Sequence, residues 1–220
     1  MKITTPRGSG TGFVVSASKA SQLCGIATAA HVVNNAHYWE EPIRIQHFNS
    51  GETFVLRKDE RAILLHEKVD TAAVLVPMGS HKLPDYTLPL SPEGMTLKLG
   101  NEIGWLGFPA LAPDNLCFFT GRASSYIEPD SAYLVDGVAI NGVSGGPAFH
   151  LGEHFPVIIG IVSAYIANRV TGETLPGMCV VRDVTHFHDV IKHLKSMDEA
   201  KEKETPPTAA PPPPPSAPES

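Results

Sequence analysis

Short apolar segments separated by turn residues make up most of the chain as far as residue 182. They are rich in β-branched residues and are bounded by Gly, Pro, Asn or Ser, which is the pattern of β-strands. Many short strands with one terminal helix predict barrels or a sandwich, not alternating βαβ units. The segments that we expect to form strands are 12–15, 43–46, 54–56, 72–76, 103–106, 132–135 and 157–163.

The hydrophobic period changes after residue 183. Apolar side chains then recur at spacings of three and four, with polar residues between them and Asp183 as a candidate N-cap. We therefore expect one amphipathic helix over 183–197 that closes the fold. Its apolar positions are Val184, Phe187, Val190, Ile191, Leu194 and Met197.

The composition changes again in the last segment, 198–220. Residues 198–204 are mostly charged, and residues 205–220 hold eight of the 20 prolines, including the run 211–215. A segment of this kind cannot bury much apolar surface, so we expect a disordered tail with polyproline II character. It would be a solvated tail or a linker, or alternatively a ligand for a partner that reads proline-rich peptides.

Charge and cysteine content exclude several classes of function. The 17 basic and 23 acidic residues give a formal net charge of −6, which does not favour binding to nucleic acid or to an anionic membrane. No segment approaches the roughly 20 consecutive apolar residues of a membrane span. Three widely spaced cysteines, without zinc-ligand spacing, indicate reduced thiols and a cytoplasmic protein.

No motif in the sequence indicates a metal or a cofactor. The pairs His186/His188 and His150/His154 have no obvious third ligand. The glycine-rich segment 8–13 lacks the preceding strand and the following helix that a phosphate-binding loop requires. We expect no bound metal and no cofactor.

The segment 141–148, Asn-Gly-Val-Ser-Gly-Gly-Pro-Ala, is the most informative in the chain. Glycines on both sides of Ser144 allow a tight turn that exposes the hydroxyl and aims successive N–H groups at one point, as an acyl-transfer oxyanion requires. The segment also satisfies G-x-S-x-G, for which Asp183 and His186 would be the acid and base of an esterase. Such an elbow leads into a helix, which Pro147 disfavours.

Two upstream segments supply candidate partners for the serine. His31 lies among small and apolar residues in Thr-Ala-Ala-His-Val, and Asp70 begins the apolar segment Asp-Thr-Ala-Ala-Val-Leu-Val. A carboxylate at the start of a buried strand is placed to hold an imidazole. Asp59 lies among charged neighbours and is the poorer candidate.

These blocks, in the order His31, Asp70, Ser144, resemble those of the trypsin-like (chymotrypsin-fold) serine peptidases. The segment 8–14, Gly-Ser-Gly-Thr-Gly-Phe-Val, is similar to the opening strand of the compact bacterial branch that includes HtrA-type proteases. Gly-Trp-Leu-Gly-Phe-Pro at 104–109 is similar to the start of the second barrel, and Gly-Ile-Val-Ser at 160–163 to the strand beside the specificity pocket. The resemblance covers residues 8–195.

The resemblance implies an all-β fold of two antiparallel six-stranded barrels, at 1–90 and 91–182, followed by the helix. The active site would lie between the barrels. His31 would be the general base and then the acid, Asp70 would orient it, and Ser144 would attack the scissile carbonyl. The N–H groups of Gly142 and Ser144 would form the oxyanion hole, and the substrate would be a protein or peptide.

The resemblance also implies a specificity pocket. Val138, six residues before the serine, would be its floor, and its wall would be formed by Ser163, Ala164 and Tyr165. In the family, the serine that matches Ser163 also hydrogen-bonds the aspartate of the triad. Without a carboxylate at the floor, a basic P1 residue would bury its charge unpaired. With Tyr165 narrowing the entrance, we expect a small or apolar P1 residue.

Three departures from the family pattern affect these expectations. Val32 replaces the usual cysteine after the histidine, so the histidine-loop disulfide is absent. Val143 replaces the aspartate that pairs with a new N-terminal amine in zymogen-type members, so we expect no activation by such a cut. We expect no PDZ-like domain after residue 195 unless the proline-rich tail connects to one. The alternatives are a catalytically silent or partner-activated module of the same fold and the G-x-S-x-G esterase.

Overall fold

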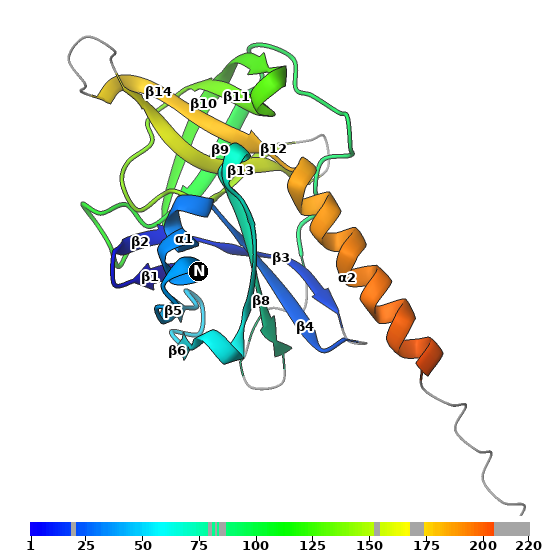
Figure 1. Ribbon diagram of the computed structural model, residues 1–220. Helices are drawn as coiled ribbons and strands as arrows, with labels where there is room; N and C mark the ends of the chain where they lie inside the picture. Colours follow the sequence, from blue (N-terminus) through cyan, green and yellow to red (C-terminus); the bar gives the residue numbers. More distant parts are fainter. Residues whose placement is uncertain are drawn as a thin grey trace, which may run out of the picture.

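The computed structural model describes residues 1–18, 21–78, 81, 83, 87–151, 155–167 and 174–204, with backbone alone for 151, 164–167, 174–176 and 202–204. Figure 1 shows two β-rich halves, with the strands β9 to β14 forming one of them. The long helix α2 starts beside that half and extends along the other.

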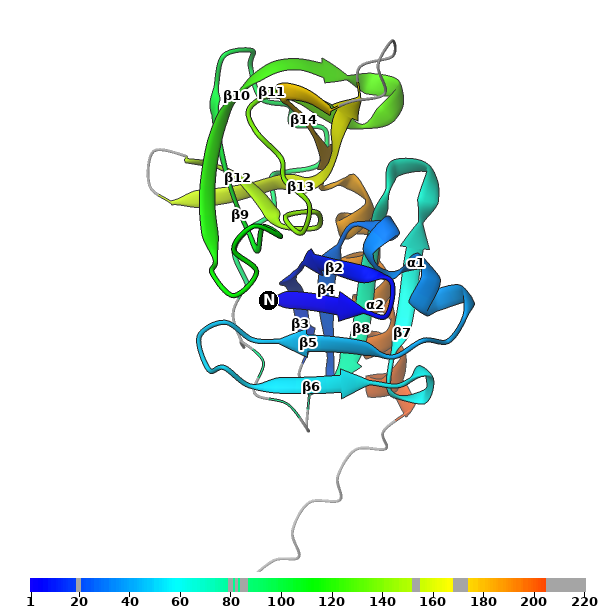
Figure 2. The ribbon, with the colours of Figure 1, turned by 90° about the vertical axis from the view of Figure 1, so that its left-hand side faces the viewer.

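Two four-stranded antiparallel sheets form the N-terminal half in the described part of the chain. Figure 2 shows the first sheet face-on, in the order β2-β1-β5-β6, and the second, in the order β3-β4-β8-β7, next to it. The strands are β1 (Lys2–Thr5), β2 (Gly8–Thr11), β3 (Phe13–Ser18), β4 (Leu23–Thr28), β5 (Ile43–Gln46), β6 (Thr53–Leu56), β7 (Ala62–His66) and β8 (Thr71–Pro77).

Alternation of apolar and polar residues explains how these strands face the core. In β5, Ile43 and Ile45 are fully buried, whereas Arg44 and Gln46 point to solvent, because successive side chains of a strand lie on opposite faces. Ile3 and Ile26 join the same apolar cluster from β1 and β4. Complete burial of each such side chain contributes about 1.5–3 kcal/mol to folding.

The C-terminal half is a closed antiparallel barrel of six strands in the order β10-β11-β14-β13-β12-β9. Trp105 is fully buried in its core and packs with Val135 and Val181. Closure pairs both edges of the sheet, so the barrel offers no open edge. The strands are β9 (Glu102–Gly107), β10 (Cys117–Ile127), β11 (Ala132–Asp136), β12 (Pro147–Leu151), β13 (Pro156–Ala167) and β14 (Thr174–Asp183).

Helix α2 (Thr185–Glu204) fastens the two halves together. Its buried Phe187 belongs to one apolar cluster with Val15 of β3 and Ile161 of β13. One and two turns further on, Val190 and Leu194 pack against β8. A second helix, α1 (Ala30–Tyr38), follows β4 directly, and short 3₁₀ turns occupy η1 (Lys58–Glu60), η2 (Glu67–Val69) and η4 (Glu128–Asp130).

The predicted all-β architecture with a C-terminal helix is confirmed, and every predicted strand segment overlaps an observed strand. The N-terminal half differs in strand count, since it consists of two four-stranded sheets, not one six-stranded barrel. The sequence reading did not find α1. None of the described helices is long and apolar enough to cross a membrane.

The end of α2 corrects the predicted boundary of the tail. The helix continues through 198–204 to Glu204, where a disordered charged segment was expected. Glu, Lys and Ala are strong helix formers, and Asp198 accepts a hydrogen bond of 2.5 Å from the hydroxyl of Ser18. Residues 205–220, with the proline run, lie outside the described residues, so their predicted character stays a prediction.

Candidate active site

His31 and Asp70 are joined by a direct pair of contacts at the edge between the two halves. His31 is the second residue of α1, and its Nδ1 lies 3.0 and 2.9 Å from the two carboxylate oxygens of Asp70. Its backbone N–H also donates to Oδ1 of Asp70 over 3.0 Å. Because an ionised carboxylate only accepts hydrogen bonds, Asp70 holds the proton on Nδ1 and leaves Nε2 as an acceptor.

The backbone around Asp70 fixes the position of its carboxylate. Asp70 ends the turn η2 with a left-handed φ of 53°, which aspartate adopts more readily than most residues. Its carbonyl accepts from the N–H of Ala30 over 3.2 Å. The start of α1 and the start of β8 are therefore tied together at the point where the imidazole meets the carboxylate.

Ser163 completes the surroundings of the Asp70 carboxylate. Its buried hydroxyl donates to Oδ2 of Asp70 over 2.5 Å. Burial alone would raise the pKa of Asp70, but the hydrogen bonds from His31 and Ser163, and the charge of His31 when it is protonated, lower it below its usual range. Asp70 is therefore held as a carboxylate beside His31.

Ser144 lies in a tight turn between β11 and β12 that only glycine can build. Gly142 and Gly145 have φ of +93° and +82°. A Cβ at Gly142 would collide with the carbonyl of Phe108, and one at Gly145 would collide with Thr28. Val143, between Gly142 and Ser144, is fully buried. The turn is thus fixed by both its backbone and its packing.

Backbone N–H groups of this turn divide into two sets. Those of Val143, Gly145 and Gly146 donate to carbonyl groups over 2.7–3.0 Å. Those of Gly142 and Ser144 donate to no group of the described chain. Two donors beside the serine hydroxyl are thus unpaired within the described chain, and their expected role as an oxyanion hole stays a prediction.

One cavity of about 370 Å³ brings His31 and Ser144 together with Gly142. The hydroxyl of Ser144 donates to the carbonyl of Ser163 over 3.3 Å, not to His31. This contact is long, and a serine hydroxyl needs only a rotation about its side-chain bonds to change partners. The two residues therefore share a cavity, and the hydrogen bond between them is not formed in this conformation.

Thr11, which the sequence reading did not single out, connects the nucleophile turn to the N-terminal half. Its N–H donates to the carbonyl of Ser144, and its hydroxyl donates to the carbonyl of Gly142, each over 2.8 Å. The same hydroxyl accepts from the N–H of Phe108 over 3.0 Å, and Thr28 donates to the Thr11 carbonyl. The contact between Thr11 and Gly142 joins residues 131 positions apart in the chain, so no local signal reveals it.

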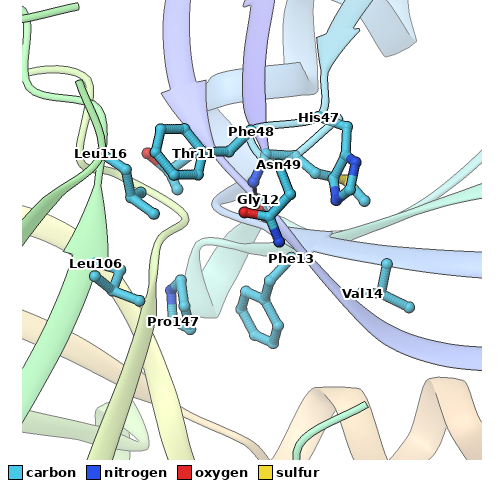
Figure 3. A pocket seen from close by; sticks show the side chains of 11 residues that line it. Thr11, Gly12, Phe13, Val14, His47, Phe48, Asn49, Leu106, Leu116 and Pro147 are labelled. Atoms are coloured by element: carbon cyan, nitrogen blue, oxygen red, sulfur yellow. Dashed lines mark hydrogen bonds between the residues drawn. The ribbon is translucent and has the colours of Figure 1, made fainter. Parts of the chain in front are cut away.

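A separate, largely apolar cavity of about 270 Å³ is lined in part by Thr11 (Figure 3). Thr11, Phe48 and Phe13 line one side of it, and Leu116 and Pro147 face them from the barrel (Figure 3). Neither His31 nor Ser144 lines it. The polar cavity and the apolar cavity share no lining residue.

The residues expected for the specificity pocket are only partly described. Val138 is 51% exposed, and its predicted place at the pocket floor stays a prediction, because the side chains of Ala164 and Tyr165 lie outside the described residues. Ala139 and Ile140 pack on the barrel core, which leaves Val138 facing outward. Ser163 is buried with its hydroxyl on Asp70.

Two other pocket residues fall where side chains are not described. Ala164 and Tyr165 pair with Val180 and Cys179 through the backbone of β13. Their side chains lie outside the described residues, so the predicted narrowing of the pocket by Tyr165 stays a prediction.

The esterase arrangement is not assembled. After Ser144 the chain enters the strand β12, not the helix that a nucleophile elbow requires. Asp183 accepts from the hydroxyl of Tyr126 over 2.6 Å and from the N–H of Thr185. Asp183 and His186 line a different cavity of about 100 Å³, which Ser144 does not reach.

Comparison with known proteins agrees with the fold. The family model of the trypsin-like peptidase domain matches residues 10–160. The crystal structure of Deg5 is similar with a TM-score of 0.57 and 19% identity, over 87% of this chain and 84% of that one. A serine endoprotease from Yersinia pestis gives a TM-score of 0.61 and 16% identity, over 88% of this chain and 61% of that one. No curated protein matches the chain significantly.

Proposed function

Because the chain belongs to the trypsin-like peptidase family, we propose that it is a serine endopeptidase that uses Ser144 as nucleophile, His31 as general base and Asp70 as orienting carboxylate. The observation that carries this proposal is the polar cavity. It combines an imidazole whose Nδ1 is fixed by Asp70, the hydroxyl of Ser144, and the free N–H groups of Gly142 and Ser144.

Each step of peptide hydrolysis has a group in this cavity. Ser144 turns from the Ser163 carbonyl, gives its proton to Nε2 of His31 and attacks the scissile carbonyl. Asp70 stabilises the imidazolium, which then protonates the leaving amine. The N–H groups of Gly142 and Ser144 stabilise the oxyanion, with about 3 kcal/mol of transition-state stabilisation for each donor. A water molecule then gives its proton to His31 and attacks the acyl-enzyme, which releases the second product and restores Ser144.

A catalytically silent or partner-activated module is the second candidate, and one observation favours it. The Ser144 hydroxyl bonds the carbonyl of Ser163, so the serine and His31 are not hydrogen-bonded in this conformation. In this alternative a bound partner would supply the rotation that brings the serine to the imidazole. The esterase has no such support, since Asp183 and His186 lie in another cavity.

A fluorophosphonate probe distinguishes these candidates, because it reacts covalently with a serine that is activated by a base. We expect labelling of the wild type and none of Ser144→Ala. Loss of labelling in His31→Ala but not in His186→Ala assigns the base to His31. A wild type that stays unlabelled by itself and reacts only after a protein or peptide partner is added indicates the partner-activated module. Absence of labelling under every condition indicates a silent module.

The preferred P1 residue can be measured with matched peptides carrying Ala, Val, Leu, Phe or Arg. We expect the lowest kcat/KM for Arg, because Val138 supplies no carboxylate to pair with its charge. We expect Ala and Val to exceed Phe if Tyr165 narrows the pocket, with Tyr165→Gly restoring Phe. A clear preference for Arg would contradict the placement of the pocket.

The hydroxyl of Thr11 provides a prediction for a positioning residue. Thr11→Val keeps the shape of the side chain but removes the hydrogen bond to the Gly142 carbonyl and leaves the Phe108 N–H unpaired. We expect kcat to fall by about tenfold with little change in KM. A displaced oxyanion donor would cost ~1.4 kcal/mol of transition-state stabilisation, which is a tenfold change in rate.

Thr28→Val is the matched control for Thr11→Val. It also removes a buried threonine hydroxyl, whose hydrogen bond goes to the Thr11 carbonyl; its side chain packs beside Gly145 but makes no hydrogen bond to the nucleophile turn. We expect a similar loss of thermal stability in both variants but a larger loss of kcat in Thr11→Val. Equal losses of kcat would mean that Thr11 acts only through general stability.

A further inference from the structure

The wall of the polar cavity beyond His31 and Ser144 carries a positively charged side chain. Of the described residues that line this cavity, Arg7 is the only one with a permanent charge, and none of them is acidic. Asn35 and Asn141 line it as well, and their side-chain amides make no hydrogen bond within the described chain. The cavity thus presents hydrogen-bond donors beside the nucleophile although the chain as a whole carries a formal charge of −6.

Arg7 is oriented in a way that leaves its recognition edge open. It lies in the turn between β1 and β2, and its Nε donates to Oε1 of Glu41 over 3.2 Å. Glu41 is itself mostly buried, with 18% of its side chain exposed, so it provides a fixed anchor. The two terminal NH₂ groups of Arg7 donate to no group in the described part of the chain. Those two groups form the planar fork that binds a carboxylate with two parallel hydrogen bonds.

The position of the cavity tells which part of a peptide reaches Arg7. His31 protonates the departing amine, so the segment on the carboxyl side of the scissile bond leaves past His31. The cavity is lined by His31, Val32 and Asn35 of α1 and by the β1–β2 turn, and none of the β13 residues whose side chains the structure describes contributes to it. It therefore accommodates the leaving segment of the substrate, on the P1′ side.

On this basis, and resting on the proposed peptidase function, we propose that Arg7 selects substrates with a carboxylate in the leaving segment. The carboxylate is the side chain of Asp or Glu at one of the positions P1′ to P3′, or the terminal carboxylate of a short leaving segment. Both present the same chemistry to the Arg7 fork. Lysine or arginine at that position would face Arg7 with a like charge.

The test uses matched peptides that share one acyl half and carry a single Glu, Gln or Lys at P1′, P2′ or P3′. Each peptide is made with a free and with an amidated carboxyl terminus. We expect the wild type to prefer Glu over Gln at one position by about fivefold in kcat/KM, since Arg7 is largely solvated and such pairs are weak. Arg7→Gln is expected to bring the ratio close to one, and Arg7→Glu to favour Lys.

Arg44→Gln is the matched control, because Arg44 is an exposed arginine on β5 that does not line this cavity. It should keep the wild-type Glu-to-Gln ratio. An equal fall of that ratio in Arg44→Gln and Arg7→Gln would overturn the proposal in favour of a general effect of charge. An unchanged ratio in Arg7→Gln would overturn it as well. A preference for the free over the amidated terminus, without an effect of internal Glu, assigns the carboxylate to the chain end.

The fluorophosphonate experiment keeps this inference separate from the proposed function. If the wild type is labelled but shows no preference that depends on Arg7, the peptidase assignment stands and the Arg7 inference fails. If the wild type is neither labelled nor active, binding of the fluorescent Glu and Gln peptides is measured by anisotropy instead. Tighter binding of the Glu peptide that is lost in Arg7→Gln supports the site; equal binding overturns it.

Discussion

Replacement of Ser144 by alanine is expected to lower kcat for peptide hydrolysis by about 10⁶-fold, and His31→Ala by a similar factor. The reason is that the hydroxyl and the imidazole act in one step, in which the serine attacks only as its proton moves to Nε2. Neither side chain belongs to the apolar core, and His31 is about half exposed. We therefore expect both variants to fold, with melting temperatures close to that of the wild type. Steady-state kinetics and thermal unfolding provide the two measurements.

Two matched controls lie outside the cavity. Ser196→Ala removes an exposed serine hydroxyl from α2, and His37→Ala removes an exposed imidazole from the same helix α1 as His31. Both should retain most of the activity. The double variant of Ser144 and His31 should be no slower than either single variant, because the two side chains act as a unit. Full turnover in purified Ser144→Ala would rule out Ser144 as the nucleophile.

The parts of the fold that could be predicted are those in which the local alternation of apolar and polar residues matches which side chains are buried. In β5 the alternation of Ile43 and Ile45 with polar neighbours is sufficient to define a strand with one buried face. The helix α1 has no such signal. It is only nine residues long and contains adjacent valines, and it forms because Val33 and Ala36 are buried against the sheet. Tertiary packing, not helix propensity, decides this segment.

The same distinction applies to the site. The order of His31, Asp70 and Ser144 could be read directly from the sequence, because each lies in a recognisable local segment. The support from Thr11 could not, since a single threonine in a glycine-rich segment has no distinctive neighbours. The exposure of Val138 depends on which residues of the loop after β11 pack on the barrel core. The spacing of six residues between Val138 and Ser144 does not determine which side chains of this loop are buried.

Asp70→Asn is expected to lower kcat by about 10⁴-fold while the active-site geometry stays nearly unchanged. The asparagine amide would present an N–H to Nδ1 of His31, where the carboxylate now accepts, and would favour the tautomer with its proton on Nε2. That nitrogen could then no longer take the proton of Ser144. Asp59→Asn is the control, because Asp59 lies in the exposed turn η1 away from the cavity. A loss below tenfold in Asp70→Asn would contradict the role of Asp70.

Asp70 also gives the pH dependence of stability a definite sign. The hydrogen bonds from His31 and Ser163 lower its pKa in the folded state against the opposing effect of burial. The unfolded chain then binds more protons in acid, with a pKa of about 3.9 for its free aspartate. The stabilising contribution of Asp70 is therefore fully present well above that unfolded value and is lost as the pH falls through the lower folded value.

Urea unfolding from pH 6 to 3 should show that the wild type loses its advantage in free energy of unfolding over Asp70→Asn in acid, whereas its difference from Asp59→Asn should change less. A gap between wild type and Asp70→Asn that is constant over this range would mean that the Asp70 carboxylate is not stabilised by His31 and Ser163.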